Sequence, residues 1–390
     1  MRIRTCARLL VAVIPFMAGC GSFWQAPGSG SGSGTTSTTL SSGFFYVLNQ
    51  ETAQIVAYNI NTGKLNQIAA YTLAAAPTAI AIAPGGNFLY VSTVAGIFLY
   101  DIGTNGALTI GNNGGVVSSD PAASIQVDHT GTWLIDAVQG TSGFQLDATP
   151  ITASGTFTGG TVDTAQYGLS NANIHQIVLS GDNLHIFVAA GTAGAVLVSF
   201  TAGNGNPLAT TGTVISPVTA GGAALSVAVD PSTTPRVFYV GETLASGGTT
   251  GGLRVFNYSS IGGTLTQASG SPIASGGLAP NAILPTANGD YVYVANGQGS
   301  TAAGNVTGFS ITASNGAYTV ATGSTVSAGV QPFSLAEDSD SNFVLTTSEG
   351  GGYDLEAYIF DATTAGKLDL AIKSTTGTDP TEAIAVGAVP

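Results

Sequence analysis

Few side chains in this 390-residue sequence could carry out acid–base chemistry, because charged residues make up only 7% of the chain and histidines number three. His175 is the first candidate for a general base, since a histidine titrates close to neutral pH. Glu242, in the segment YVGETL, is the carboxylate that could act with it as an acid–base pair. Each residue also has a simpler structural interpretation. The histidine could hydrogen-bond a neighbouring part of the fold, and the glutamate could be solvated or cap a backbone segment.

The other residues of chemical interest form no catalytic or metal-binding motif. His129 falls in a predicted turn and His185 at the start of a predicted strand, so the histidines are too dispersed for a zinc site of closely spaced ligands. A D-x-D-x-N spacing begins at Asp338, with Glu349 at the twelfth position, but Phe343 stands where a calcium loop requires glycine. No G-x-S-x-G nucleophile motif occurs. The sequence therefore predicts no metal and no cofactor.

The balance of charges excludes a nucleic-acid partner. Three of the eight cations lie within the first eight residues, which leaves five cations against twenty-one acidic residues in the rest of the chain. Binding to a phosphate backbone requires clustered lysine and arginine. Lysine and glutamate are also too scarce to coat the surfaces of helices, so neither a coiled coil nor a helical bundle is expected.

The N-terminal segment has the composition of an export signal. Residues 1–19 combine three arginines with a short apolar run and small residues before Cys20, a pattern that resembles a bacterial lipoprotein signal peptide. We expect Cys20 to be lipidated and to anchor the chain in the cell envelope, with Gly21 favouring the outer membrane. The alternative is an ordinary secretory signal that leaves Cys20 as an unpaired thiol. Residues 20–43 are rich in Gly, Ser and Thr, which predicts a flexible linker before a folded domain at 44–390.

A repeat organises the rest of the chain. Its clearest copy, from Pro77 to Leu108, alternates apolar and polar residues over three strand-length segments that are separated by Gly-containing turns. Further copies follow at intervals of about 50 residues, the length of a four-stranded β-propeller blade. They begin at Pro121, Ile174, Ala224, Pro280 and Pro332, with a truncated copy at Pro380.

The incomplete repeats at the two ends of the chain complement each other. The chain enters the domain at Phe44 with the second and third strands of a unit and ends, after Pro380, with a first strand. We therefore predict an all-β fold, a seven-bladed β-propeller with four-stranded blades, in which the C-terminal strand joins the sheet that begins at Phe44 and closes the ring. A transmembrane β-barrel, the other all-β alternative, would require alternating segments of about ten residues.

The strand motifs FLYVS and YVYVANG, together with the repeat length, resemble the lactonase-type seven-bladed propellers and the wider YVTN-repeat propellers. The first of these is the family of 6-phosphogluconolactonase and carboxymuconate cyclase. The resemblance implies a site at one mouth of a central channel, and the family's histidine falls on His175. Its two arginines fall on Leu225 and Gly297, and its glutamate falls on Thr243, next to Glu242. Because both arginines are missing, hydrolysis of a phosphorylated lactone is not expected.

The same register places further candidate binding residues at this mouth. They are Asn49, Thr78, Asn281 and Asn296, with Arg254 on the same face but displaced from the axis. Because this mouth is nearly uncharged, we expect an exported, monomeric, non-catalytic or catalytically degenerate module that binds a small molecule, glycan or protein and contacts the membrane only through Cys20. Hydrolysis of an uncharged lactone by His175 and Glu242 is the first alternative. A purely structural platform for envelope assembly is the second.

Overall fold

The structure is a computed structural model, and it describes residues 40, 42–232, 234, 236–299, 301–314, 317–375 and 383–389. Contacts divide the chain into residues 1–35 and 36–390, and every described residue belongs to the second unit. The predicted signal peptide, Cys20 and nearly all of the linker therefore lie outside the described residues. The described chain is all-β apart from one 3₁₀ turn, η1 (Asn112–Gly114), and contains no helix long and apolar enough to cross a membrane.

The first sheet joins the two ends of the described domain. Its strand order is β29 (Ala383–Ala388), β1 (Phe44–Asn49), β2 (Gln54–Asn61) and β3 (Lys64–Thr72). In the antiparallel pair of β1 and β29, Phe45 lies opposite Ala388 and Val47 opposite Val386. The predicted pairing of the C-terminal strand with the strand that begins at Phe44 is confirmed, and it gives β1 a partner on both sides.

The next two sheets each correspond to one copy of the repeat. The second sheet contains β4 (Pro77–Ile82), β5 (Phe88–Thr93), β6 (Gly96–Ile102) and β7 (Leu108–Ile110), with β8 (Val116–Ser118) also paired to β6. The third contains β9 (Ser124–Val127), β10 (Trp133–Gln139), β11 (Phe144–Pro150) and β12 (Asp163–Tyr167). Consecutive strands are antiparallel neighbours, as the short turns of the repeat require.

The fourth sheet combines two copies of the repeat. The first copy supplies β13 (Ala172–Leu179), β14 (His185–Gly191), β15 (Ala195–Phe200) and β16 (Leu208–Ile215). The second supplies β17 (Ala224–Val229), β18 (Val237–Ser246), β19 (Thr250–Ser259) and β20 (Thr264–Gln267), with β21 (Ile273–Ala274) paired to β19. A single residue pair, Gly191 with Ala224, joins the two halves.

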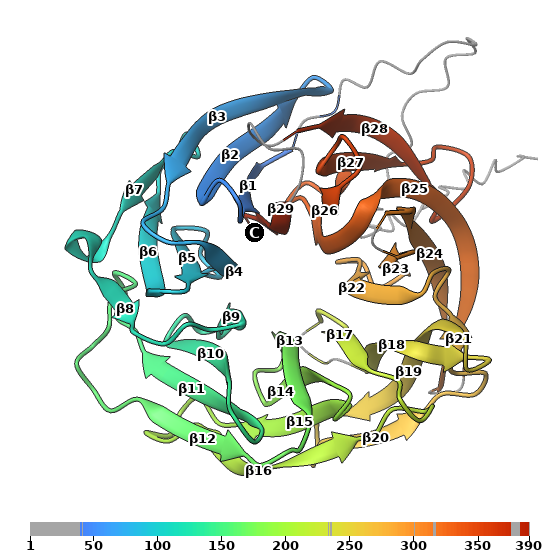
Figure 1. Cartoon of the computed structure of the whole chain (residues 1–390), viewed down its shortest axis with the longest axis horizontal. Helices are drawn as coiled ribbons and strands as arrows, with labels where there is room; N and C mark the ends of the chain where they lie inside the picture. Colours follow the sequence, from blue (N-terminus) through green and yellow to red (C-terminus); the bar gives the residue numbers. More distant parts are fainter. Residues whose placement is uncertain are drawn as a thin grey trace, which may run out of the picture. The chain divides into compact units, whose positions relative to one another are not determined.

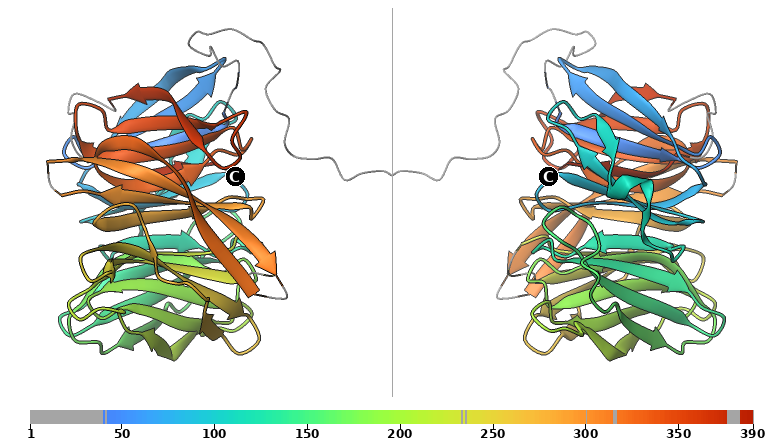
Figure 2. Two further views of the ribbon diagram at one scale, coloured as in Figure 1. Left: turned by 90° about the vertical axis from the view of Figure 1, so that its right-hand side faces the viewer. Right: turned by 90° about the vertical axis from the view of Figure 1, so that its left-hand side faces the viewer.

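The fifth sheet also combines two copies, through one long strand. It contains β22 (Ala279–Pro285), β23 (Tyr291–Gly297), β24 (Ala303–Ser314), β25 (Ala317–Glu337), β26 (Phe343–Gly350), β27 (Leu355–Phe360) and β28 (Leu368–Ser374). The 21-residue β25 pairs with β24 along its first part and with β26 along its last part, and it runs obliquely past its neighbours in the side views (Figure 2). The chain therefore passes from the outer edge of one copy to the inner edge of the next within one strand, which the division of the sequence into separate blades did not predict.

Seven four-stranded groups can be traced through these five sheets, and each is named here by its innermost strand: β29, β4, β9, β13, β17, β22 or β25. Within the described residues, each innermost strand contacts the next one in this order, and β25 contacts β29. Figure 1 shows these strands around a common centre, with the later strands of each group farther out. The side chains of the innermost strands are therefore brought together from seven separate parts of the sequence.

A buried tyrosine in the second strand of several groups explains the Tyr-Val motif of the repeat. Its hydroxyl donates a hydrogen bond to the carbonyl of a glycine in the outer turn of the next group. The pairs are Tyr46 with Gly106 (2.9 Å), Tyr90 with Gly155 (2.7 Å) and Tyr293 with Gly366 (3.0 Å). The three glycines have φ angles of 77°, 75° and 73°, which residues with a side chain rarely adopt. The contact packs a large ring between two groups while its hydroxyl stays paired.

Candidate functional site

The innermost strands line a polar cavity of about 270 Å³. Residues of β4, β13, β22, β25 and β29 contribute to its wall, together with residues 123–126 at the start of the β9 group. The predicted general base His175 and two of the predicted binding residues, Thr78 and Asn281, lie in this wall, as does Phe333. The structure thus brings together side chains that are more than 250 positions apart in the sequence (Thr78 and Phe333).

His175 is the one ionisable side chain in the described wall of the cavity. Its ring is exposed to the cavity, and its Nε2 lies 3.3 Å from Nδ2 of Asn173. The surrounding wall removes part of its hydration and lowers the pKa of His175 below its ordinary value. The imidazole is therefore neutral at pH 7, so one ring nitrogen can accept a proton or a hydrogen bond.

Most of the other polar side chains in the wall also link neighbouring groups. Thr78 Oγ1 donates to the Ala122 carbonyl (2.7 Å) and Asn281 Nδ2 to the Pro332 carbonyl (3.0 Å). The Oε1 atoms of Gln126 and Gln176 accept hydrogen bonds from the amides of Leu179 (2.8 Å) and Val227 (3.1 Å). These bonds fix the side chains in position and leave the amide nitrogens of the two glutamines as donors that a ligand in the cavity can use.

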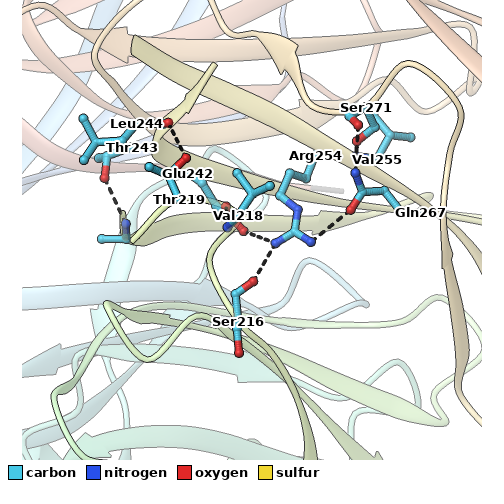
Figure 3. A network of polar contacts seen from close by, with 11 residues as sticks. Ser216, Val218, Thr219, Glu242, Thr243, Leu244, Arg254, Val255, Gln267 and Ser271 are labelled. Atoms are coloured by element: carbon cyan, nitrogen blue, oxygen red, sulfur yellow. Dashed lines mark hydrogen bonds and ion pairs between the residues drawn. The ribbon is translucent and has the colours of Figure 1, made fainter. Parts of the chain in front are cut away.

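The partners of Glu242 in the structure are groups other than His175. Glu242 lies near the middle of β18 with no exposed surface, and its Oε1 accepts a hydrogen bond from Nη1 of Arg254 (2.6 Å). Its Oε2 accepts one from the backbone amide of Val218 (3.0 Å) (Figure 3). Both carboxylate oxygens are therefore already engaged within the protein, and Glu242 is absent from the described wall of the cavity.

Arg254 is likewise a structural cation rather than a ligand-binding one. It lies on β19, is 7% exposed, and also donates to the Ser216 carbonyl (2.8 Å) and to Oε1 of Gln267 (3.0 Å) (Figure 3). Its guanidinium lies 4.9 Å from the centre of the Phe256 ring. The ion pair with Glu242 holds the connection between β16 and β17 against the β17 group. Arg254 lies on the third strand of its group and is not among the described residues of the cavity wall.

The predicted binding residues Asn49 and Asn296 also lie outside the cavity wall. Both are fully buried at or near the ends of second strands. Asn49 Oδ1 accepts a hydrogen bond from the Thr52 amide (3.1 Å), and Asn296 Nδ2 donates to the Ser275 carbonyl (2.7 Å) and to Oδ1 of Asn305 (3.0 Å). These positions stabilise turns and connections, because the second strand lies one strand farther from the centre than the first.

Three residues of the wall that can contact a ligand, Phe333, Gln126 and Gln176, were not predicted as binding residues. Phe333 is 40% exposed, and Gln126 and Gln176 contribute the donors described above. Phe333 occupies the same position of the repeat as Thr78 and Asn281, so the register of the first strands contained the information needed to find it.

The remaining sequence candidates have structural surroundings. His185 is buried, and its Nδ1 lies 2.5 Å from the hydroxyl of Tyr258. Asp338 accepts hydrogen bonds from the backbone amides of Asn342 (2.8 Å) and Phe343 (2.5 Å), as the carboxylate of a hairpin turn does. His129 is exposed in the turn between β9 and β10.

Solved structures of other proteins have a similar architecture, although the sequence itself has no match. The sequence matches no protein-family model and no curated protein. Among solved structures, a candidate 6-phosphogluconolactonase from Bacteroides fragilis is similar with a TM-score of 0.69 and 14% identity, over 91% of this chain and 99% of that one. The periplasmic gluconolactonase of Pseudomonas aeruginosa gives a TM-score of 0.67 and 16% identity, over 90% of this chain and all of that one (100%). The resemblance inferred from the repeat is confirmed at the level of the fold: this chain has the fold of the 6-phosphogluconolactonase-like β-propellers.

Proposed function

We propose that this chain is a closed seven-bladed β-propeller, exported and anchored through Cys20, that binds a small, uncharged, hydroxyl-rich ligand in its central cavity without catalysing a reaction. The observation that supports this function most directly is the composition of the cavity wall. It contains amide and hydroxyl side chains and one neutral histidine, with no carboxylate, lysine or arginine among its described residues. Such a wall offers hydrogen bonds to a neutral polar molecule and no partner for a phosphate or carboxylate.

The size and chemistry of the cavity favour a ligand of about the size of a single sugar ring. A volume of about 270 Å³ is at the lower end of the range for small-molecule pockets. The ring of Phe333 offers an apolar face, while the amide nitrogens of Gln126 and Gln176 and the ring of His175 offer hydrogen bonds around it. A cyclic sugar or an aldonolactone has both kinds of surface.

The closed ring and the anchor rest on different observations. The ring is supported by the contacts that lead from β29 through β4, β9, β13, β17, β22 and β25 back to β29. The export signal and lipidation of Cys20 are supported by the sequence of residues 1–20 alone. Labelling of the full chain with a fatty-acid probe tests the anchor, since Cys20→Ser should abolish incorporation; labelling that persists in this variant would exclude Cys20.

A second candidate function is the hydrolysis of an uncharged lactone, which the gluconolactonase among the structural neighbours favours. Neutral His175 would take a proton from water as the oxygen of that water bonds to the lactone carbonyl carbon. The ring C–O bond would then break, and the released alkoxide would take up the proton held by His175, which returns the histidine to its neutral form. A donor from Gln176 would stabilise the oxyanion. No carboxylate orients His175 in the described structure, so this activity would be weak.

A panel of neutral lactones and monosaccharides separates the two functions. The mature protein, His175→Ala and the control His129→Ala would each be assayed for binding by calorimetry and for hydrolysis by proton release. Saturable binding without turnover, weakened in His175→Ala and unchanged in His129→Ala, would support the binding module. Turnover that His175→Ala abolishes would replace it with the hydrolase. Absence of both would leave the structural platform and overturn the proposal.

A further inference from the structure

Three aspartates form a cluster in the β9 group, outside the described wall of the central cavity. One carboxylate oxygen from each of Asp120, Asp136 and Asp147 lies within 4.8 Å of the others. Asp136 on β10 and Asp147 on β11 lie directly opposite each other, and Asp120 comes from the connection between β8 and β9. Leu134 lies on the same face of β10 as Asp136 and packs in a core cluster with residues of the β4 group. The cluster is therefore located beside the interface between the β4 and β9 groups.

Asp136 occupies a position of the repeat that is otherwise apolar or neutral. It stands where other second strands have the valine of the Tyr-Val motif or its counterpart: Val47, Val91, Val188, Val240, Val294 and Thr346. A carboxylate in this buried position costs free energy unless a partner compensates it. The departure from the repeat therefore needs a physical explanation that the fold alone does not provide.

The protein itself provides little compensation to this cluster. Asp136 has no exposed surface, and neither of its carboxylate oxygens has a hydrogen-bond partner. Asp147, which is 1% exposed, accepts hydrogen bonds from Thr164 Oγ1 (2.5 Å) and Gln145 Nε2 (2.6 Å), which hold its carboxylate beside Asp136. No lysine, arginine or histidine in the described part of the chain forms an ion pair with any of the three aspartates.

Two carboxylates that are both buried and close together repel each other, so the site favours any species that brings positive charge between them. The unpartnered carboxylate of Asp136 points into the space that such a species would occupy, because its ligand oxygen lies within 4.8 Å of those of Asp120 and Asp147.

We propose that Asp120, Asp136 and Asp147 bind a calcium ion. Calcium takes oxygen ligands at about 2.3–2.6 Å, so oxygens around one ion are at most about 5 Å apart, which the cluster satisfies. The ligand set contains only carboxylates, which favours a hard cation over zinc or copper. Calcium is favoured over magnesium because it accepts irregular coordination by protein oxygens and loses its water more readily. The ion ties the connection before β9 to the sheet of the β9 group.

Calorimetry with calcium chloride on the chelator-treated protein tests this site, with thermal unfolding in calcium or EDTA as a second measurement. The variant Asp136→Asn keeps the shape of the side chain and removes the central charge. Asp290→Asn makes the same change at an exposed carboxylate and is the control. We expect one calcium site in the wild type and a rise in Tm with calcium. The affinity should fall at least tenfold in Asp136→Asn and remain unchanged in Asp290→Asn.

Asp120→Asn, at a half-buried position on the connection, gives a second test if Asp136→Asn does not fold. It too should weaken calcium binding severalfold. The proposal is overturned if the wild type binds no calcium, if binding persists unchanged in the cluster variants, or if magnesium binds as tightly as calcium. In one such outcome, the wild type binds no calcium and Asp136→Asn has a higher Tm than the wild type in EDTA. That result would indicate that the aspartates form a carboxyl pair that shares a proton.

Discussion

In the β17 and β25 groups, the same position of the third strand holds a charged residue. The side chains that surround this residue compensate its charge differently in the two groups. Arg254 in the β17 group lies opposite Val240, and Glu356 in the β25 group lies opposite the equivalent Thr346. Arg254 is paired with the carboxylate of Glu242, whereas the residue equivalent to Glu242 in the β25 group is Ser348, whose Oγ lies 3.4 Å from Oε2 of Glu356.

This difference sets the charge state of the two sites. In the β17 group, two opposite charges compensate each other in a buried place. In the β25 group, burial raises the pKa of Glu356 to about 7, and the nearby Asp354 acts in the same direction, while Lys373 opposes it only in part. One position of the repeat therefore belongs to an ion pair in one group and holds an acid that titrates near neutral pH in another. Substitutions at Arg254 and Glu356 test this difference directly, and two further substitutions measure smaller contributions elsewhere in the fold.

The largest effect is expected from Arg254→Met, which leaves the buried carboxylate of Glu242 without its cation. The free energy of unfolding should fall by about 3–5 kcal/mol, the usual consequence of removing one member of a buried ion pair. Denaturant unfolding measures it, with Lys64→Met as the control at an exposed cation. The double variant Glu242→Gln/Arg254→Met should recover part of the loss. A double variant less stable than Arg254→Met would show that the ion pair is not the cause.

Glu356→Gln should change the pH dependence of stability. Below pH 4.5 the carboxyl is protonated in the folded and unfolded chain, and between pH 4.5 and 7 only the unfolded chain ionises, so the wild type loses stability as the pH rises. The variant has no carboxyl group at this position, so its free energy of unfolding does not decrease in this way. The decrease in the wild type approaches about 3 kcal/mol above pH 7. Unfolding at pH 4.5, 6 and 8 measures the difference. The exposed Glu349→Gln is the control, and a variant that is no more stable than wild type at pH 8 would contradict the assignment.

Tyr90→Phe should have a smaller effect, because it removes one neutral hydrogen bond and leaves the ring packed. The free energy of unfolding should fall by about 1 kcal/mol, since the carbonyl of Gly155 loses its donor in a buried place. Thermal unfolding against Tyr353→Phe, at a tyrosine that is 40% exposed, measures it. Equal effects in the two variants would show that the bond between groups contributes nothing.

Phe333→Ala should affect stability least and binding most. Its side chain is 40% exposed, so the free energy of unfolding should change by less than about 1 kcal/mol. Binding of a monosaccharide or lactone found with the panel above should weaken about tenfold because the apolar face of the cavity is lost. Phe157→Ala, at a phenylalanine that is 38% exposed outside the cavity, is the control. Unchanged binding in Phe333→Ala would remove Phe333 from the site.

The predicted site residues that lie in the described wall of the cavity come from first strands. Thr78, His175 and Asn281 share one position of the repeat, and the structure brings all three into one wall. The predicted site residues that are not in the described wall come from second strands (Asn49, Glu242 and Asn296) or a third strand (Arg254). Their distance from the centre depends on how each sheet is inclined and packed, and no periodicity along a single strand records that distance.

The all-β fold and the length of the repeat could be predicted from the sequence, because the alternation of apolar and polar residues is a local property of each strand. The pairing of the two ends could be predicted because the incomplete repeats there complement each other. Which charged side chains lie next to each other could not be predicted from the sequence. Glu242 has Arg254 as its partner across a hairpin instead of His175, and Asp136 faces Asp147 and Asp120. Electrostatic interactions depend on distances of a few ångströms between side chains, and those distances are set only when the sheets pack against one another.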